Sequence, residues 1–221
     1  MLGKYSKEIK EKYKNTEPTL DEKELVMFFK KDGIQIKNQI MQKWETPYME
    51  QLANIATLRG GDILEVGYGM GISAGFIEKS PKIKTHAIIE CHPVMIANLK
   101  KRFSQQIQEG RVIILEGFWE DVVKRIPKET FDGILFDSCP LDKEVEFFQF
   151  FPFFKEAARL LKSNGVFTYF SDEASSISEP HQCELKEAGF TDIRFEICHV
   201  EPPKDCIYWK HKTIVAPIIK K

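Results

Sequence analysis

The sequence predicts an α/β fold in which a mostly parallel, seven-stranded sheet is covered by helices on both faces. From residue 62 onwards, short apolar runs typical of buried strands alternate with longer stretches that suit helices. The first run leads into a glycine-rich turn, and the last two runs have no helix between them. Strands that alternate with helices form parallel sheets, whereas two consecutive strands favour an antiparallel hairpin at the carboxyl end.

The size and composition of the chain suit one soluble domain. Its 221 residues are 43% hydrophobic, and 32 Lys and Arg nearly balance 33 Asp and Glu. We therefore expect residues 1–221 to form a single domain without a basic field for nucleic acid. No apolar run approaches the roughly 20 residues of a membrane span. The charged amino terminus is unlike a secretory signal, so we expect no membrane partner and a cytoplasmic protein.

The cysteines and histidines indicate neither disulfides nor a metal. The five cysteines are an odd number without a CxxC pair, and the five histidines form no HxxxH motif or Cys/His cluster. Free thiols are therefore expected, and no metal site.

The amino-terminal part of the chain is predicted to be helical. Residues 1–24 mix six lysines with six acidic residues, which favours a solvated arm or a loose helix. From Leu25 to Leu58 the apolar positions recur at helical spacing, and Pro47 fits the start of a second helix. We therefore expect at least two helices before the first strand.

The remaining elements follow in order along the chain. Strands are expected at residues 62–66, 84–90, 111–116, 131–137, 165–171, 192–200 and 207–217. Helices are expected at residues 72–79, 93–108, 119–126 and 145–162. The last two strands are joined by residues 201–206, which predicts a hairpin at one sheet edge. A run of phenylalanines is expected to form core or a subunit contact: Phe147, Phe148, Phe150, Phe151, Phe153 and Phe154.

A glycine-rich turn follows the first strand and opens the next helix. It contains Gly67, Gly69 and Gly71, where the missing Cβ atoms allow a sharp turn and close approach of a ligand. The nicotinamide fingerprint GxGxxG requires glycine at position 72, which is Ile72. The spacing, with Glu65 at its start, instead favours S-adenosylmethionine, with a simple tight turn as the alternative.

Two further motifs fit the same cofactor. Glu90 ends the second strand, where a carboxylate can accept both hydroxyls of a ribose. After the third strand, Trp119 and Glu120 provide an aromatic face and an acceptor that can flank adenine. Ordinary helix packing is an equally good interpretation of Trp119.

In combination, these motifs resemble class I S-adenosylmethionine-dependent methyltransferases, which have a Rossmann-like seven-stranded sheet. More narrowly, residues 40–218 resemble the guanidinoacetate N-methyltransferase family, to which arginine delta-N-methyltransferases are similar. The matching segments are Trp44-Glu-Thr-Pro-Tyr-Met49, Leu64-Glu-Val-Gly67, Ile88-Ile-Glu-Cys91, Trp119-Glu-Asp121 and Phe131-Asp-Gly-Ile-Leu135, with Asp137 and Pro140. In that family the amino-terminal part folds over the active site, so the resemblance implies that residues 1 to about 58 form a helical cap.

The resemblance also implies the residues of the site. The catalytic carboxylate is Asp137, at the end of the fourth strand, and Glu45 is the second carboxylate that grips the guanidino group. The implied cofactor contacts are Met49, Gly67, Tyr68, Gly69, Met70, Gly71, Ile72, Ser73, Glu90, Cys91, His92, Trp119, Glu120 and Asp137. The implied substrate contacts are Met41, Glu45, Asp137, Asp172 and Glu173. Met41 and Met49 fit simple core packing equally well.

The implied reaction is methylation of a guanidino group on a small molecule, with S-adenosyl-L-homocysteine as the other product. Methylation of arginine, free or in a protein, is the alternative. A regulatory cofactor-binding protein is disfavoured by Asp137 and Glu45, and a dehydrogenase by Ile72. The quaternary structure is expected to be a monomer or a homodimer.

The segment after the fifth strand departs from the family pattern. In the family this segment binds the substrate carboxylate through main-chain NH groups, whereas here it contains Asp172 and Glu173. Two acidic side chains repel a carboxylate. We therefore hypothesise a guanidino substrate with a neutral or positive far end, as in arginine or agmatine.

Overall fold

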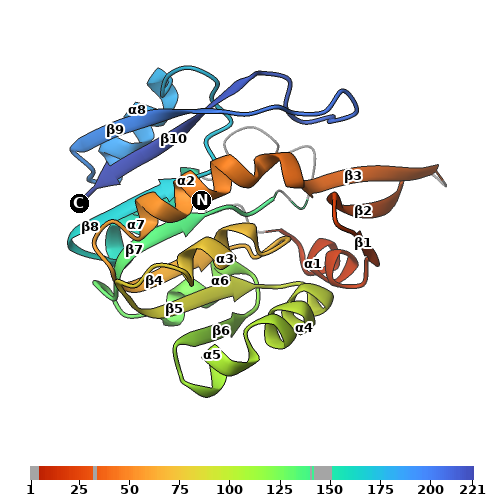
Figure 1. The fold of residues 1–221 in the computed structure, drawn as a ribbon, viewed down its shortest axis with the longest axis horizontal. Coiled ribbons are helices and arrows are strands. Elements are labelled where there is room, and N and C mark those ends of the chain that lie inside the picture. Colours follow the sequence, from red (N-terminus) through yellow and green to blue (C-terminus); the bar gives the residue numbers. More distant parts are fainter. Residues whose placement is uncertain (1–4, 32–33, 140, 142–150) are drawn as a thin grey trace.

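The structure, a computed structural model, describes residues 5–31, 34–139, 141 and 151–221. It contains a seven-stranded sheet of order β6-β5-β4-β7-β8-β10-β9 and a three-stranded sheet of order β1-β2-β3. The predicted α/β class and the seven-stranded sheet are confirmed. In Figure 1 the small sheet and helix α1 lie together at one end of the large sheet. None of the helices among the described residues is long and apolar enough to cross a membrane.

Five parallel strands form the centre of the large sheet. β4 (Gly61–Val66) pairs with β5 (Ile83–Glu90) on one side and with β7 (Phe131–Phe136) on the other. β6 (Val112–Glu116) and β8 (Leu161–Tyr169) continue the parallel pairing outwards. The strands are rich in buried Val, Ile, Leu and Phe because helices cover both faces. All five carboxyl ends therefore meet at one edge of the sheet.

The carboxyl-terminal hairpin is antiparallel, as predicted. β10 (Thr213–Lys220) lies between β8 and β9 (Asp192–His199) and pairs with both. It begins six residues later than the predicted position 207, so the connection from β9 is a long loop. Cys206 and Trp209 of this loop are 0% and 6% exposed. The apolar residues that suggested a strand from position 207 instead belong to this loop, where they pack against the core.

Helices cover both faces of the sheet. One face packs against α2 (Thr46–Ala56), α3 (Ile72–Ile77), α4 (Pro93–Arg102) and α5 (Ser104–Gln108). The predicted helix at residues 93–108 is therefore divided at Phe103, which is buried between α4 and α5.

The opposite face packs against α6 (Trp119–Val122), the 3-10 turn η2 (Val123–Arg125), α7 (Phe151–Leu160) and α8 (Glu179–Glu187). Phe153 and Phe154 of α7 are fully buried in this core, which confirms the core interpretation for these two residues. Phe147, Phe148 and Phe150 lie outside the described residues.

Helix α8 was missed by the sequence analysis. It is mostly polar, and its buried residues are His181 and Leu185. Two buried positions give too weak a helical period to be recognised.

The prediction of helices from Leu25 onwards is wrong for residues 25–42. Helix α1 (Lys7–Lys14) is followed by three antiparallel strands, β1 (Pro18–Leu20), β2 (Glu24–Lys31) and β3 (Ile34–Gln42). The cap implied for residues 1 to about 58 is therefore mixed rather than helical. A 3-10 turn, η1 (Lys43–Glu45), then leads into α2.

The failed helix prediction has an identifiable cause. Leu25, Val26 and Met27 are consecutive and all buried, and the pairing of β2 with β3 shifts register between Leu25 and Val26. A step of one residue in β2 is matched by two residues in β3, where Ile40 is the extra residue. Ile40 and its neighbour Met41 therefore both line the cavity described below, which interrupts the alternation expected of a strand. The Asp-Gly pair at positions 32 and 33 is the sequence signal for a hairpin that was overlooked.

Candidate active site

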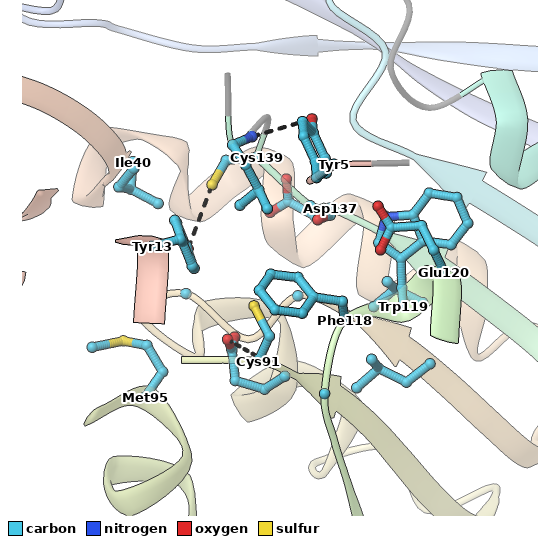
Figure 2. Close-up of a pocket in the computed structure, with 18 of the residues that line it drawn as sticks. Tyr5, Tyr13, Ile40, Cys91, Met95, Phe118, Trp119, Glu120, Asp137 and Cys139 are labelled. Carbon is cyan, nitrogen blue, oxygen red and sulfur yellow. Dashed lines mark hydrogen bonds between the residues drawn. The ribbon is translucent and has the colours of Figure 1, made fainter. Parts of the chain in front are cut away.

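A cavity of about 290 Å³ lies where the carboxyl ends of the parallel strands meet the amino-terminal segment. Val66, Glu90 and Asp137 line it from the ends of β4, β5 and β7, and Tyr13 and Met27 line it from the cap (Figure 2). The chain reverses its direction of growth across the sheet at β4, and ligands bind in open α/β sheets at such switch points. The cavity is therefore the candidate active site.

The glycine loop closes tightly against the neighbouring strand. Gly67 and Gly71 have φ angles of 91° and 67°, in the left-handed region. A Cβ atom on Gly67 would lie 2.0 Å from the carbonyl oxygen of Asp137, and one on Gly71 would lie 2.5 Å from the ring of Tyr68. The turn therefore requires glycine at both positions, and it holds the ends of β4 and β7 together.

Glu90 links this loop to the next one. Its Oε2 accepts a hydrogen bond of 3.0 Å from the Tyr68 N–H, and its Oε1 accepts bonds of 2.7 and 2.8 Å from the N–H groups of Cys91 and His92. The carboxylate is 7% exposed and lines the cavity. Because a carboxylate oxygen can accept more than one hydrogen bond, Oε2 retains capacity for a ligand hydroxyl.

A buried network lies behind the glycine loop. The Ser73 hydroxyl donates to Glu65 Oε1, and His86 Nε2 lies 3.0 Å from Glu65 Oε2. His86 Nδ1 lies 3.1 Å from Glu78 Oε1. Burial opposes protonation of His86, but the hydrogen bonds with the two carboxylates outweigh it and raise the imidazole pKa. The hydroxyl of Ser73 is thus directed at Glu65.

Trp119 and Glu120 sit at one side of the cavity (Figure 2). The Trp119 ring packs edge-on against Phe136 and Phe153, with centroid distances of 5.6 and 5.4 Å, so it also belongs to the core. Glu120 is 5% exposed, and its Oε2 has no hydrogen-bond partner among the described residues. Burial raises the pKa of this carboxyl. An unpaired buried acceptor fits a ligand that carries an amino group, such as adenine.

The amino-terminal segment is fixed across the cavity. Lys10 Nζ lies 2.6 Å from Asp121 Oδ2, and His92 Nε2 donates a bond of 2.9 Å to the carbonyl oxygen of Thr16. Tyr13 is 7% exposed and packs on the ring of His92 at a centroid distance of 5.5 Å. Figure 2 shows Tyr13 beside Cys139, opposite Phe118.

Glu45 and Asp137 are two carboxyls whose pKa values are raised by burial and by neighbouring negative charges. Glu45 is 2% exposed, and its Oε1 accepts bonds of 2.5 Å from the Tyr208 hydroxyl and 2.7 Å from the Gln42 N–H. Burial, followed by the charge of Asp137, raises the pKa of Glu45 to about 8. Burial, followed by the charges of Glu65 and Asp172, raises the pKa of Asp137 to about 7. A bound cation would favour the charged form of both.

The end of β8 is fixed to the start of α2. The Tyr48 hydroxyl donates a bond of 2.8 Å to the carbonyl oxygen of Val215 and accepts one of 3.3 Å from the Ser171 N–H. Glu45 lies one turn before Tyr48, and Asp172 directly follows Ser171. Two segments that are distant in the sequence therefore carry carboxylates to the same region.

Asp172 and Glu173 differ in their surroundings. Asp172 is exposed and has a φ angle of 56°, in the left-handed region. Although the residue is exposed as a whole, partial loss of water and then the charge of Glu173 raise its pKa to about 6. Glu173 Oε1 instead lies 3.5 Å from Nε2 of the buried His181.

The sequence profile of the guanidinoacetate N-methyltransferase family matches residues 6–221, which is almost the whole chain. The chain belongs to this family. The recognition made from the sequence motifs is thus confirmed. The chain is therefore a member of a methyltransferase family, whose cofactor is S-adenosylmethionine.

Curated relatives carry the name protein arginine N-methyltransferase 2. The protein of that name from Aspergillus fumigatus is 30% identical over 181 residues, covering 77% of this chain and 40% of the relative. The one from Aspergillus oryzae is 32% identical over 205 residues, covering 84% of this chain and 47% of the relative. The chain thus spans less than half the length of these relatives.

Solved structures support the fold. A spermidine synthase bound to a transition-state analogue superposes with a TM-score of 0.64 at 17% identity, covering 92% of this chain and 72% of that one. TYW2 of M. jannaschii in complex with AdoMet gives a TM-score of 0.56 at 15% identity, covering 91% of this chain and 87% of that one. At these identities the likeness shows the fold alone.

Eight of the residues expected from the family resemblance lie in the cavity wall: Met41, Gly67, Gly69, Glu90, Cys91, Trp119, Glu120 and Asp137. The others do not line it: Glu45, Met49, Tyr68, Met70, Gly71, Ile72, Ser73, His92, Asp172 and Glu173. Met49 is fully buried in the core beneath the site. Glu45 does not line the cavity, but it lies near enough to Asp137 for the charge of that residue to raise its pKa.

Several residues of the site were not anticipated. Tyr13 and Met27 line the cavity from the cap, and Cys139 follows Asp137. Tyr208, in the loop before β10, donates to Glu45. Tyr13 lies in a charged segment without any motif, and Tyr208 was assigned to a strand, so neither carried a usable signal.

Proposed function

We propose that the protein transfers the methyl group of S-adenosylmethionine to a nitrogen of a guanidino group. The observation that carries this proposal is that Asp137 lines the cavity while the buried carboxyl of Glu45 lies near enough to feel its charge. No Lys, Arg or His in the described ranges forms an ion pair with either carboxylate. Two acidic groups without a cation partner fit a planar cationic ligand such as a guanidinium.

The cofactor supplies an electrophilic methyl group on a positively charged sulfur. Glu90 fits the ribose hydroxyls through the free capacity of Oε2, and Glu120 fits the adenine amino group through its unpaired Oε2. Gly67 and Gly69 keep the loop open to a ligand because side chains there would fill the space between β4, β7 and the cap.

The carboxylates have separate tasks in the proposed reaction. Glu45, held by Tyr208 and Gln42, orients the guanidinium and keeps it beside the cationic sulfur by offsetting the repulsion between the two charges. As the new bond from nitrogen to methyl carbon forms and the bond from sulfur to carbon breaks, that nitrogen loses a proton to Asp137. The raised pKa of Asp137, about 7, makes its carboxylate a better proton acceptor than an exposed aspartate.

Arginine within a protein is the second candidate substrate. The curated relatives named protein arginine N-methyltransferase 2 support it, at identities of 30% and 32%. Those relatives are more than twice the length of the region that matches this chain.

A substrate panel tests the proposal. The protein is incubated with labelled S-adenosylmethionine and guanidinoacetate, arginine, agmatine, guanidine or an arginine-containing peptide, and the products are identified by mass spectrometry. We expect methylation of at least one guanidino compound. Methylation of the peptide alone would select the second candidate, and no methylation of any member would refute both.

A substitution at Asp137 tests its role in the same assay. We expect Asp137→Asn to keep cofactor binding and lose turnover by about a hundredfold or more, as loss of a general base implies. Asp132→Asn is the matched control, because Asp132 lies at the opposite end of the same strand and binds Lys162. Unchanged turnover in Asp137→Asn would remove Asp137 from the reaction.

A further inference from the structure

The loop after β8 brings a third carboxylate to the region of Glu45 and Asp137. β7 and β8 are parallel neighbours, and the Phe170 N–H donates a bond of 3.0 Å to the carbonyl oxygen of Phe136. Asp137 and the segment that carries Asp172 therefore leave the sheet side by side. The negative charge of Asp172 acts on both Glu45 and Asp137.

The turn at Asp172 is held by its neighbours. The Ser171 hydroxyl donates a bond of 2.7 Å to the carbonyl oxygen of Val215, and the Val215 N–H donates one of 2.8 Å to the carbonyl oxygen of Glu173. The residues on both sides of Asp172 are thus attached to β10, while Asp172 itself takes the left-handed conformation and remains exposed. A left-handed non-glycine residue costs energy, so the surrounding bonds must maintain it.

The two acidic residues of this loop are not equivalent. Glu173 has a polar neighbour in His181, at 3.5 Å, whose imidazole is kept neutral because burial lowers its pKa to about 4. Asp172 has no ion-pair partner in the part of the chain that the structure describes. Of the two, Asp172 is therefore the carboxylate available to a ligand.

Charge balance points to the ligand that Asp172 would meet. In the proposed function, Glu45 and Asp137 offset one guanidinium and one sulfonium charge. Asp172 then adds a negative charge that neither the reacting groups nor the protein neutralises. A second positive charge on the substrate would neutralise it, whereas a carboxylate there would be repelled.

Resting on the proposed function, we propose that Asp172 selects guanidino substrates that carry a positive charge at the end remote from the guanidino group. The substrate class is an aminoalkylguanidine, in which an ammonium group reaches the loop after β8 while the guanidinium lies between Glu45 and Asp137. Compounds that end in a carboxylate are poor substrates.

Three compounds with the same four-carbon spacer test the proposal: 4-guanidinobutylamine, butylguanidine and 4-guanidinobutyrate. We expect kcat/KM to fall in that order, by about tenfold from the first to the second and again to the third. Asp172→Asn keeps a side chain that tolerates the left-handed conformation, so the loop is retained. The ratio of kcat/KM for the amine to that for the carboxylate should fall at least tenfold in this variant.

The ratio separates selectivity from general effects on rate. Neutralising Asp172 also changes the pKa of Asp137, but this change acts equally on all three compounds and cancels in the ratio. Glu179→Gln, which removes the same charge from an exposed residue at the start of α8, is the control and should leave the ratio near that of the unmodified protein.

The outcomes distinguish this inference from the proposed function. A wild-type preference for the carboxylate compound, or an unchanged ratio in Asp172→Asn while butylguanidine is methylated, overturns the role of Asp172 alone. Failure of all three compounds, together with the panel described above, overturns the proposed function and the inference with it.

Discussion

At the scale of single residues, the hydroxyl of Tyr208 helps to set the pKa of Glu45. Its hydrogen bond to Glu45 Oε1 opposes the effects of burial and of Asp137, which raise the pKa of Glu45 to about 8. A guanidinium binds to the ionised carboxylates, so binding releases protons and should strengthen as the pH rises through the pKa values of about 7 and 8.

Removing this hydroxyl should therefore move the pH profile. We expect Tyr208→Phe to raise the pKa of Glu45 further, shift the acidic limb of kcat/KM to higher pH, and lower kcat/KM at neutral pH by about tenfold. The measurement is kcat/KM between about pH 6 and about pH 9. A uniform fall at every pH would show that Tyr208 only supports the fold of its loop.

The candidate site could be predicted in part from the sequence. Residues at strand ends, such as Glu90 and Asp137, were found because the sheet edge collects them whatever the details of packing. Tyr208 was missed because its contact with Glu45 joins positions 163 residues apart in the sequence. No local pattern records such a contact.

At the scale of elements, His86 joins two strands and a helix beneath the cofactor loop. Both ring nitrogens face carboxylates, Glu65 of β4 and Glu78 just beyond α3, which favours the imidazolium form. The folded pKa is raised above the unfolded value. The stabilisation is therefore complete below the unfolded pKa of about 6.5 and is lost as the pH rises through the folded pKa.

The raised pKa of His86 leads to a prediction about how stability depends on pH. We expect His86→Gln to destabilise the protein by about 2–4 kcal/mol at low pH, because two buried carboxylates lose their cationic partner. The difference in Tm from the unmodified protein should be largest near about pH 6 and shrink at higher pH. Thermal unfolding at several pH values measures it, and a difference that grows with pH would contradict the protonated assignment.

Elements were predictable where burial repeats regularly along the chain. β4, β5 and β7 end in apolar runs that are buried on both faces, so their positions followed from composition and turns. In β2 and β3 the strand period was interrupted by three consecutive buried residues, Leu25 to Met27, and by the extra residue Ile40, and helix α8 buries too few residues to produce a period. In both cases tertiary packing determined the secondary structure, and a local sequence pattern does not report such packing.

At the scale of the whole molecule, α1 acts as a cover that is separate from the sheet. It contributes Tyr13 to the cavity wall and is attached through Lys10 to Asp121, while the seven strands pair without it. We expect deletion of residues 1–16 to weaken S-adenosylmethionine binding by about tenfold or more, since the cavity loses apolar wall area.

Calorimetric titration of the shortened protein with S-adenosylmethionine measures this effect. Far-ultraviolet circular dichroism serves as the control, because the large sheet should remain folded. An unchanged affinity for S-adenosylmethionine would show that α1 contributes nothing to cofactor binding.

The position of β10 between β8 and β9 affects how the protein is made. A ribosome completes Asp192–His199 before Thr213–Lys220, so β9, with its outward-facing Phe195 and Ile197, has no hydrogen-bonding neighbour until the later strand emerges. Val215, the acceptor for Tyr48, also arrives at that stage. Assembly of the candidate site therefore waits for Thr213–Lys220, and a nascent chain halted before Thr213 exposes an unpaired strand that chaperones would have to shield.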